Sequence, residues 1–308
     1  MYKRQELGFV EYLHNLTPAQ QDMILNAPTR YVISWFPVWN ANSVSTPCRL
    51  VFDATRAVHQ ESSLNNLLAK GANNMNSLIE ILIRWTTHKF AYHTDIAKMY
   101  NRVHLDETHW RFQLYYWDEQ LREGVDPVLK VIKTLIYGVR PSGQLAEVAL
   151  RRTAEETKET YPLAYKVIME DIYVDDDMSG NDSEKSRNET TDQLVLALEK
   201  GGFSLKGFTF SGEDPPSHLS EDGVSVSVGG MKWYSKDDEI TLKGPDLNFG
   251  KMDRGRKPSK NISERLTRRD CASKVAEIFD PTGRITPLTS GLKPVSYTHL
   301  TLPTTPYV

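Results

Sequence analysis

The chain has 308 residues, with 37 lysines and arginines against 40 aspartates and glutamates and a formal net charge of −3. This ordinary composition predicts one or two globular domains with a substantial core. No apolar run approaches the roughly 18 residues of a membrane-spanning helix, and residues 1–9 contain no apolar segment of a secretory signal. The two cysteines, Cys48 and Cys271, are too few for a disulfide framework or a structural zinc site, so we expect reduced thiols inside the cell.

Charge is distributed unevenly along the chain. Residues 251–269 hold eight basic residues against two acidic ones, and five of the eight residues in 170–177 are carboxylates. The acidic segment is compatible with bound cations and the basic segment with a polyanion. Two solvated surfaces would give the same distribution, and charge alone favours that simpler interpretation.

Helices and strands are predicted in irregular alternation, which is typical of an α+β fold rather than a doubly wound sheet. Ser77 is a helix N-cap by residue type, and Gly201 with Gly202 ends a later helix. In chain order we expect a strand at 49–52, a helix after Ser77, a strand leading into a turn at 92–100, a strand at 111–117, a helix at 143–159, a strand at 166–174 with its hairpin return at 177–179, a helix at 192–200, a hairpin made of 224–233 and 239–242, and a helix at 266–279.

The sharpest local feature is the run Tyr173-Val174-Asp175-Asp176, which follows a predicted strand at an expected hairpin tip. Two adjacent carboxylates repel each other, so at neutral pH the pair favours a bound cation or a proton. Mg²⁺ suits such a pair, because it binds one or two carboxylates together with substrate phosphates. An Asp-rich turn explains the same residues without any ligand, since Asp stabilises turns through its own side chain.

Another carboxylate, Asp95, stands at the end of the strand predicted within 92–100. Strand ends in one sheet can converge, so Asp95 can meet Asp175 and Asp176 across eighty residues of sequence. Three carboxylates on two adjacent strands make a two-metal site for phosphoryl transfer. The alternative is that Asp95 only caps the helical turn that follows it.

In this order the segments resemble the reverse transcriptases of long-terminal-repeat retrotransposons, and more narrowly the BEL/Pao family. Residues 49–55 read R-L-V-F-D-A-T, which is similar to the fingers motif R-x-V-F-D-A-[ST] of that family. Residues 137–143 depart from the second palm motif, because proline stands at position 141 and glycine at 143. The resemblance covers 6–293 and rests on the ordered blocks 7–11, 35–38, 49–55, 63–71, 95–100, 173–176, 201–206 and 266–283.

The resemblance implies that Asp95, Asp175 and Asp176 are catalytic and bind two Mg²⁺ ions, with Mn²⁺ as a substitute. It also implies substrate contacts from Arg49, Tyr100, Gly138, Tyr173 and Lys206.

Three of these residues have simpler explanations as well. Arg49 would contact the incoming triphosphate, which suits its planar and always charged head, or it is an ordinary surface arginine. Tyr100 would exclude ribonucleotides by occupying the space of a 2′-hydroxyl, or it is a core aromatic residue. Lys206 would act as a general acid toward the leaving pyrophosphate, or it is a surface lysine.

Two further carboxylates, Asp53 and Asp177, each have two possible roles. Asp53 could pair with Arg49, or it could simply shape the fingers. Asp177 follows Asp176 directly, so strand alternation turns it to the opposite side. We therefore expect Asp177 either to support the site from behind or to lie in solvent.

The family implies a right-hand polymerase fold within the α+β class, with an antiparallel palm sheet. The fingers would comprise 6–92 and 106–136, the palm 93–105 and 137–242, and the start of the thumb or connection region 243–293. Residues 1–5 and 294–308 resemble translated sequencing adapter, and we expect an artefactual leader and a disordered tail there.

The implied function is that of an RNA-directed DNA polymerase fragment, acting on deoxynucleoside triphosphates and on an RNA or DNA template with a primer. We expect no membrane association, other Pol and Gag products of the same element as partners, and a location in cytoplasmic virus-like particles or in the nucleus. The segment 251–269 would lie near the template–primer backbone, or it is a basic loop. One alternative is a catalytically inactive nucleic-acid-binding relic, which only experiment can distinguish. The other is a metal-dependent nuclease, and the ordered fingers blocks argue against the nuclease.

Overall fold

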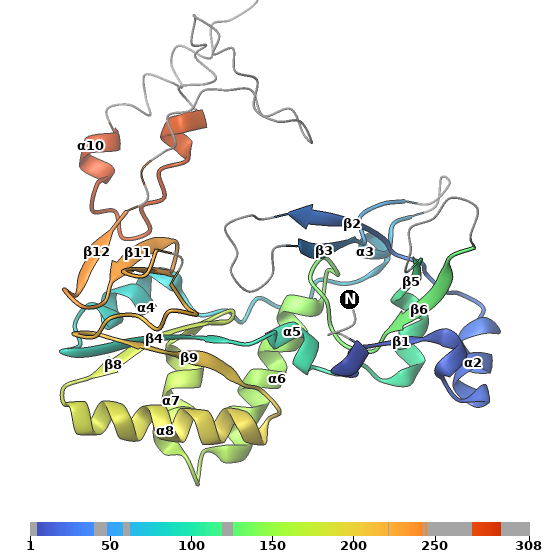
Figure 1. The fold of residues 1–308 in the computed structure, drawn as a ribbon, viewed down its shortest axis with the longest axis horizontal. Helices are drawn as coiled ribbons and strands as arrows, with labels where there is room; N and C mark the ends of the chain where they lie inside the picture. The colour runs from blue at the N-terminus through green and yellow to red at the C-terminus, as the bar shows by residue number, and fades with distance from the viewer. Residues whose placement is uncertain are drawn as a thin grey trace, which may run out of the picture.

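The computed structural model describes residues 5–39, 48–57, 62–118, 126–220, 222–242, 244 and 273–290. Within these ranges four antiparallel sheets combine with helices, so the predicted α+β class is confirmed (Figure 1). The basic segment 251–269, the tail 294–308 and residues 1–4 of the leader lie outside the described residues, as does the predicted helix at 266–279 up to residue 272.

The strands are β1 (Val10–Tyr12), β2 (Ser34–Trp39), β3 (Cys48–Asp53), β4 (Phe90–Ile96), β5 (Leu114–Trp117), β6 (Val128–Ile132), β7 (Ile172–Tyr173), β8 (Asp176–Asn181), β9 (Leu205–Phe210), β10 (Val226–Val228), β11 (Met231–Tyr234) and β12 (Glu239–Thr241). The helices are α2 (Pro18–Leu25), α3 (Leu64–Leu67), α4 (Leu78–Trp85), α5 (Met99–Arg102), α6 (Ser142–Thr157), α7 (Pro162–Glu170), α8 (Glu184–Lys200) and α10 (Thr286–Ser290), with 3₁₀ turns η1 (Leu13–Asn15) and η2 (Glu107–Phe112).

The largest sheet has the strand order β7-β8-β4-β9, so β4 is flanked by β8 and β9. Alternation along β4 sends Tyr92 and Ile96 to one face and Ala91 to the other, and both faces are covered. Helices α6, α7 and α8 pack on the first face, whereas α4 and the β10–β12 sheet lie on the second (Figure 1). A strand buried from both sides is held firmly, which makes β4 a rigid base for any side chain at its end.

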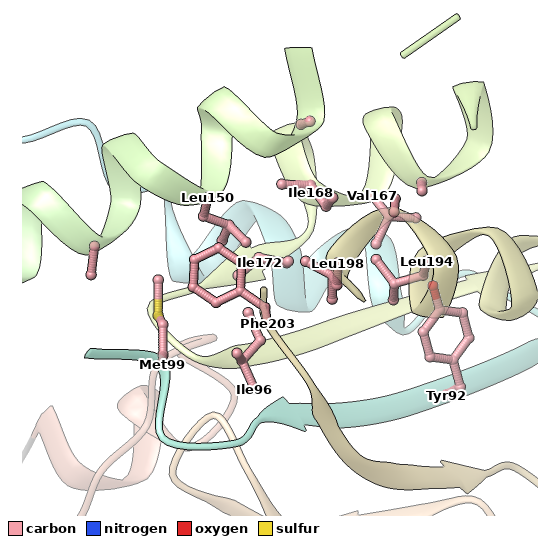
Figure 2. Packing of buried hydrophobic residues seen from close by; sticks show 14 of the residues in the cluster. Tyr92, Ile96, Met99, Leu150, Val167, Ile168, Ile172, Leu194, Leu198 and Phe203 are labelled. Carbon is pink, nitrogen blue, oxygen red and sulfur yellow. The ribbon is translucent and has the colours of Figure 1, made fainter. Parts of the chain in front are cut away.

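The core on the first face comes from apolar residues at helical spacing. Figure 2 shows Leu150 of α6, Val167 and Ile168 of α7, and Leu194 and Leu198 of α8 directed toward the sheet. Each such side chain, fully buried, contributes about 1.5–3 kcal/mol relative to exposure. Hydrophobic burial is therefore a large contribution to holding the three helices on the sheet.

A second group of elements consists of the sheet β1-β6-β5 and the two-stranded sheet β2-β3. Their shared core includes Phe52 and Tyr115, whose rings meet edge to face at 5.2 Å. The expected boundary between fingers and palm, at residues 92 and 93, falls inside β4. Helix α4, which precedes that boundary, packs on the main sheet, with Trp85 against Trp233 at 4.9 Å.

The prediction of a strand at 166–174 is wrong, because most of this segment is helix α7 and only Ile172–Tyr173 forms a strand. Pro162 stands in the first turn of the helix, where its fixed φ is favourable. The β-branched residues Val167 and Ile168 suggested a strand, but with Ala164 they form a helical face at spacing i, i+3, i+4. Packing of that face against α6 and α8 overrides the strand propensity.

Other predicted elements are confirmed with changed limits. Ser77 caps α4 as expected, accepting a hydrogen bond from the Glu80 N–H. Helix α8 ends at Gly201 but begins at Glu184, two turns earlier than predicted, after the cap Ser183. The segment 224–242 contains three strands, β10, β11 and β12, rather than one hairpin.

Within the described ranges, none of the helices combines the length and the apolar composition needed to cross a lipid bilayer.

The turn at Gly138 generates a stability prediction. Gly138 has φ +97°, and a Cβ atom there would lie 2.4 Å from the Phe52 carbonyl oxygen. Gly138→Ala should therefore lower the free energy of unfolding by about 2 kcal/mol or more, since a left-handed backbone alone costs about 1–2 kcal/mol for an L-residue. Gly202→Ala is the matched control, because Gly202 has φ +78° with nothing within 4 Å of the added atom. Equal losses in urea unfolding would show that the contact with Phe52 is unimportant.

Candidate active site

Two of the predicted carboxylates lie opposite each other on paired strands. Asp95 of β4 is the direct antiparallel partner of Asp176 of β8. Directly opposed residues share a face of the sheet, with Cβ atoms about 5 Å apart. The strand pairing therefore brings together two side chains that are separated by eighty-one positions in sequence.

The third carboxylate, Asp175, lies in the tight turn of the β7–β8 hairpin. Tyr173 pairs with Asp176, so only Val174 and Asp175 connect the two strands. Val174 has φ +60°, a conformation that β-branched residues rarely adopt and that costs about 1–3 kcal/mol. The N–H of Ile96 donates to the Asp175 carbonyl at 2.8 Å, which fastens the strained turn beside Asp95.

Burial and the closeness of the three carboxylates make the charged forms of Asp95 and Asp175 less favourable. Burial raises the pKa of Asp175 to about 6, and Asp95 and Asp176 act in the same direction. Burial also raises the pKa of Asp95, and Lys206 opposes that rise. The Lys206 Nζ lies 2.7 Å from Asp95 Oδ1, so this half-exposed lysine partly neutralises the cluster.

The donor chemistry fits a hard divalent cation. Carboxylate oxygens are the ligands that Mg²⁺ prefers, and a cation would offset both the burial of Asp175 and its repulsion from Asp95 and Asp176. Asp95 is paired with Lys206, and His93 Nε2 lies 3.4 Å from Asp176 Oδ1. In the part of the chain that the structure describes, no three His, Cys, Asp or Glu side chains yet surround one point closely enough to hold an ion. Binding would therefore require these side chains to turn toward a common centre.

Tyr100 stands beside the carboxylates, as predicted. The chain turns at Lys98, which has φ +54°, and α5 then places Tyr100 half-buried near Asp175. Burial and the charge of Asp175 both raise the pKa of Tyr100. A Cβ atom at Gly143 would lie 3.3 Å from the Tyr100 hydroxyl, so a glycine in α6 leaves room for this ring.

Arg49 and Asp53 take separate places on β3. Arg49 is exposed opposite Val38, and its charge acts on the Tyr137 hydroxyl, which places the guanidinium on the side of the cluster. Asp53 accepts hydrogen bonds from the N–H and the hydroxyl of Thr55. Asp53 therefore shapes the turn after β3, which is one of its two expected roles.

Gly138 and Tyr173 are also close to the cluster but have structural contacts of their own. The Gly138 carbonyl accepts a hydrogen bond from Asn65 Nδ2 at 2.8 Å, and Asn65 Oδ1 accepts from the Arg140 N–H. These bonds hold the loop before α6 against α3. Tyr173 shares a face of the sheet with Asp176 and packs partly on the core beneath α4.

Asp177 lies on the other side of β8, fully buried against the helix-covered face. Among the described residues neither of its carboxylate oxygens has a hydrogen-bond partner. Burial raises the pKa of Asp177 well above its ordinary value, and Asp171 and Asp176 raise it further. The expectation that Asp177 lies in solvent is wrong, because α7 and α8 cover the face to which alternation turns it.

Sequence reasoning missed His93 and Tyr137. His93 is two positions before Asp95, so the period of a strand places both on one face, and this spacing was the available signal. Tyr137 directly precedes Gly138, and its ring centroid lies 4.0 Å from that of Tyr100. Burial raises the pKa of Tyr137, with smaller effects from Asp175, Tyr100 and Asp95.

No protein-family model matches the chain, and no curated protein matches it either. Function is therefore inferred from the residues and from their arrangement.

The burial of Asp177 predicts a pH-dependent gain in stability for Asp177→Asn. Burial raises the pKa of Asp177 above that of the same carboxyl group in the unfolded chain, about 4, so the folded protein binds this proton more tightly. As pH rises above about 4, the folded state therefore loses stability relative to the unfolded chain. The loss is about 1.4 kcal/mol for each pH unit until the pKa of Asp177 in the folded protein is reached. Neutral Asn removes this penalty, so its free energy of unfolding should exceed that of the parent by about 1 kcal/mol or more at pH 7.

Urea unfolding at pH 4, 5.5 and 7 measures this difference. The gain should shrink toward pH 4, where both states of the parent are protonated. Asp192→Asn, at an exposed carboxylate on α8, is the control and should change little at any pH. A gain that does not vary with pH would contradict a buried protonated carboxyl group.

Proposed function

We propose that the chain is an RNA-directed DNA polymerase, the reverse transcriptase of a retrotransposon similar to the BEL/Pao family. The observation that carries the proposal is the cross-strand position of Asp95 opposite Asp176, with Asp175 in the turn between β7 and β8. Two predicted motifs far apart in sequence thus supply one cluster. Burial, together with the neighbouring charges of Asp95 and Asp176, raises the pKa of Asp175, and such a perturbed carboxylate cluster supports a site that handles cations and phosphates.

The reaction is attack of a primer 3′-hydroxyl on the α-phosphate of a deoxynucleoside triphosphate, with release of pyrophosphate. Asp95, Asp175 and Asp176 would hold two Mg²⁺ ions. When bound, these ions supply activation of the attacking hydroxyl and neutralisation of the triphosphate charge. The chain itself supplies position and electrostatics, so no protein nucleophile is required.

Two cationic side chains would handle the triphosphate. Lys206 is a direct neighbour of Asp95, at 2.7 Å, which favours a role at the site over that of an ordinary surface lysine. From there its ammonium group would donate a proton to the leaving pyrophosphate. Arg49, exposed on β3 on the side of the Tyr137 hydroxyl, would grip the triphosphate with its planar head.

The template, the primer and the other Pol and Gag products of the element are the partners that this function implies. Its setting would be a cytoplasmic particle or the nucleus. A catalytically inactive nucleic-acid-binding relic is the competing possibility, and primer extension distinguishes the two.

The test of function compares Asp175, in the turn before β8, with Asp177, on the buried face of β8. Asp175→Asn keeps the side-chain volume but removes a charge from the cluster, so extension of a primer on an RNA template with Mg²⁺ should fall to background. Asp177→Asn changes the same chemistry on the buried side and should cause a much smaller decrease.

Circular dichroism of both variants should match the parent, which separates a chemical defect from unfolding. Extension by Asp175→Asn near the parent rate would contradict the carboxylate assignment. A parent chain that binds template–primer but never extends it would favour the inactive relic.

Tyr100 generates a prediction about sugar selection. Its ring lies beside Asp175 and against Tyr137, where it would fill the space of a 2′-hydroxyl. Tyr100→Ala should therefore raise the ratio of kcat/KM for ribonucleotides to that for deoxynucleotides by a factor on the order of 10. Tyr100→Phe, which keeps the ring, is the control and should leave the ratio near that of the parent. An unchanged ratio in the alanine variant would place the selectivity elsewhere.

A further inference from the structure

Asp171 lies outside the carboxylate cluster, and its hydrogen bonds connect α7, β8 and α4. It is the last residue before β7, four positions ahead of Asp175, and is 7% exposed. Its N–H donates to the Val167 carbonyl at 2.8 Å and so ends α7, while its own carbonyl accepts from the Met178 N–H of β8 at 3.2 Å. The backbone of this one residue therefore joins α7 to the strand that begins with Asp176.

Both carboxylate oxygens of Asp171 are also engaged. Oδ2 accepts a hydrogen bond from the Ser179 hydroxyl of β8 at 2.8 Å, and this bond is buried. Oδ1 accepts from Nε of Arg84 on α4 at 3.0 Å, and the same guanidinium also donates to the Glu170 carbonyl. Hydrogen bonds to a charged, poorly solvated group are stronger than those between neutral groups.

The hairpin that these contacts hold has little support of its own. β7 has two residues and lies at the edge of the sheet, so it pairs with β8 alone. The turn between them carries the strained Val174. A short edge strand with a strained turn keeps its position only if its surroundings determine it. From the side of α7 and α4, Asp171 reaches β8 through its carbonyl and its Oδ2, while Asn76 Nδ2 donates to the Ile172 carbonyl of β7 at 3.0 Å.

We propose that Asp171 is a positioning residue, which sets β8 against α7 and α4 and thereby places Asp175 and Asp176 opposite Asp95. The inference rests on the proposed polymerase function, because it concerns the same carboxylate cluster. Asp171 touches neither the cluster nor the reacting atoms, and acts through Ser179 and the backbone of the hairpin. Partners that orient metal ligands in this way change metal affinity or activity by about 10–100-fold when removed.

The contacts themselves indicate which substitution preserves the position. In Asp171→Asn the amide oxygen can still accept from Arg84, and the amide nitrogen can donate to the Ser179 oxygen. Asp171→Ala loses both contacts. Ser179→Ala removes only the bond to β8 and leaves the ion pair with Arg84, so it decides the question if Asp171→Ala does not fold.

The experiment measures Mn²⁺ binding by calorimetry, without substrate, together with kcat and KM in primer extension. Asp171→Ala should bind Mn²⁺ about tenfold or more weakly and lose kcat with little change in the KM for the nucleotide, and Asp171→Asn should recover most of both. Thr157→Ala is the matched control, since it removes a buried hydrogen bond from Thr157 to Thr153 within α6, away from the hairpin. It should lower the melting temperature without changing Mn²⁺ affinity.

The outcomes separate this inference from the function on which it rests. If the parent binds Mn²⁺ and extends primers, but Asp171→Ala and Ser179→Ala do both equally well, positioning by Asp171 is refuted and the polymerase function stands. Loss in the alanine variants that Asn does not recover would also refute positioning through these two hydrogen bonds. If the parent neither binds Mn²⁺ nor extends primers, the proposed function fails and the inference fails with it.

Discussion

Repulsion among three carboxylates, two of them on paired strands, is the constraint on which the rest of this structure depends. Two unit charges about 5 Å apart at an effective dielectric of about 20 repel by about 3 kcal/mol, a large share of the 5–15 kcal/mol that stabilises a typical domain. Strand pairing nevertheless sets Asp95 against Asp176 and brings Asp175 beside them. Lys206 offsets part of this repulsion, and hydrophobic burial on the covered faces of the main sheet offsets more of it.

One face of β8 contributes Asp176 to the carboxylate cluster, and the other face packs into the core beneath the helices. Alternation turns Asp176 to the open end of the sheet, where His93 and a half-exposed Lys206 lie near the cluster, and turns Asp177 into the core beneath the helices. Burial raises the pKa of Asp177, so the side chain on this face favours its protonated form. Asp171 adds charge on the buried side, yet both of its own oxygens are paired. Among the described residues, both oxygens of Asp171 therefore accept hydrogen bonds on this buried face, whereas those of Asp177 accept none.

Support for the site comes from several elements rather than from one loop. Ile96 fastens the turn at Asp175 to β4, and the bond from Asn65 to the Gly138 carbonyl holds the loop before α6 against α3. That loop places the ring of Tyr137 against the ring of Tyr100. The position of these rings beside the carboxylates therefore depends on the main sheet and also on the core shared by the β1-β6-β5 and β2-β3 sheets. Strain at Val174 persists because these surroundings leave the turn no other conformation.

The amino-acid sequence by itself determined the elements that follow from local chemistry: the α+β class, the Ser77 cap of α4, the strand around Arg49, the end of α8 at Gly201 and the acidic turn after Tyr173. The family resemblance also singled out Asp95 and Lys206, and the fold places Lys206 Nζ 2.7 Å from Asp95 Oδ1. Only the tertiary structure decided that 162–170 is a helix, that Asp177 is buried, and that His93 and Tyr137 stand beside the carboxylates. The physical reason is that periodicity and capping act within a few residues, whereas burial and cross-strand contact depend on which distant segment packs on each face.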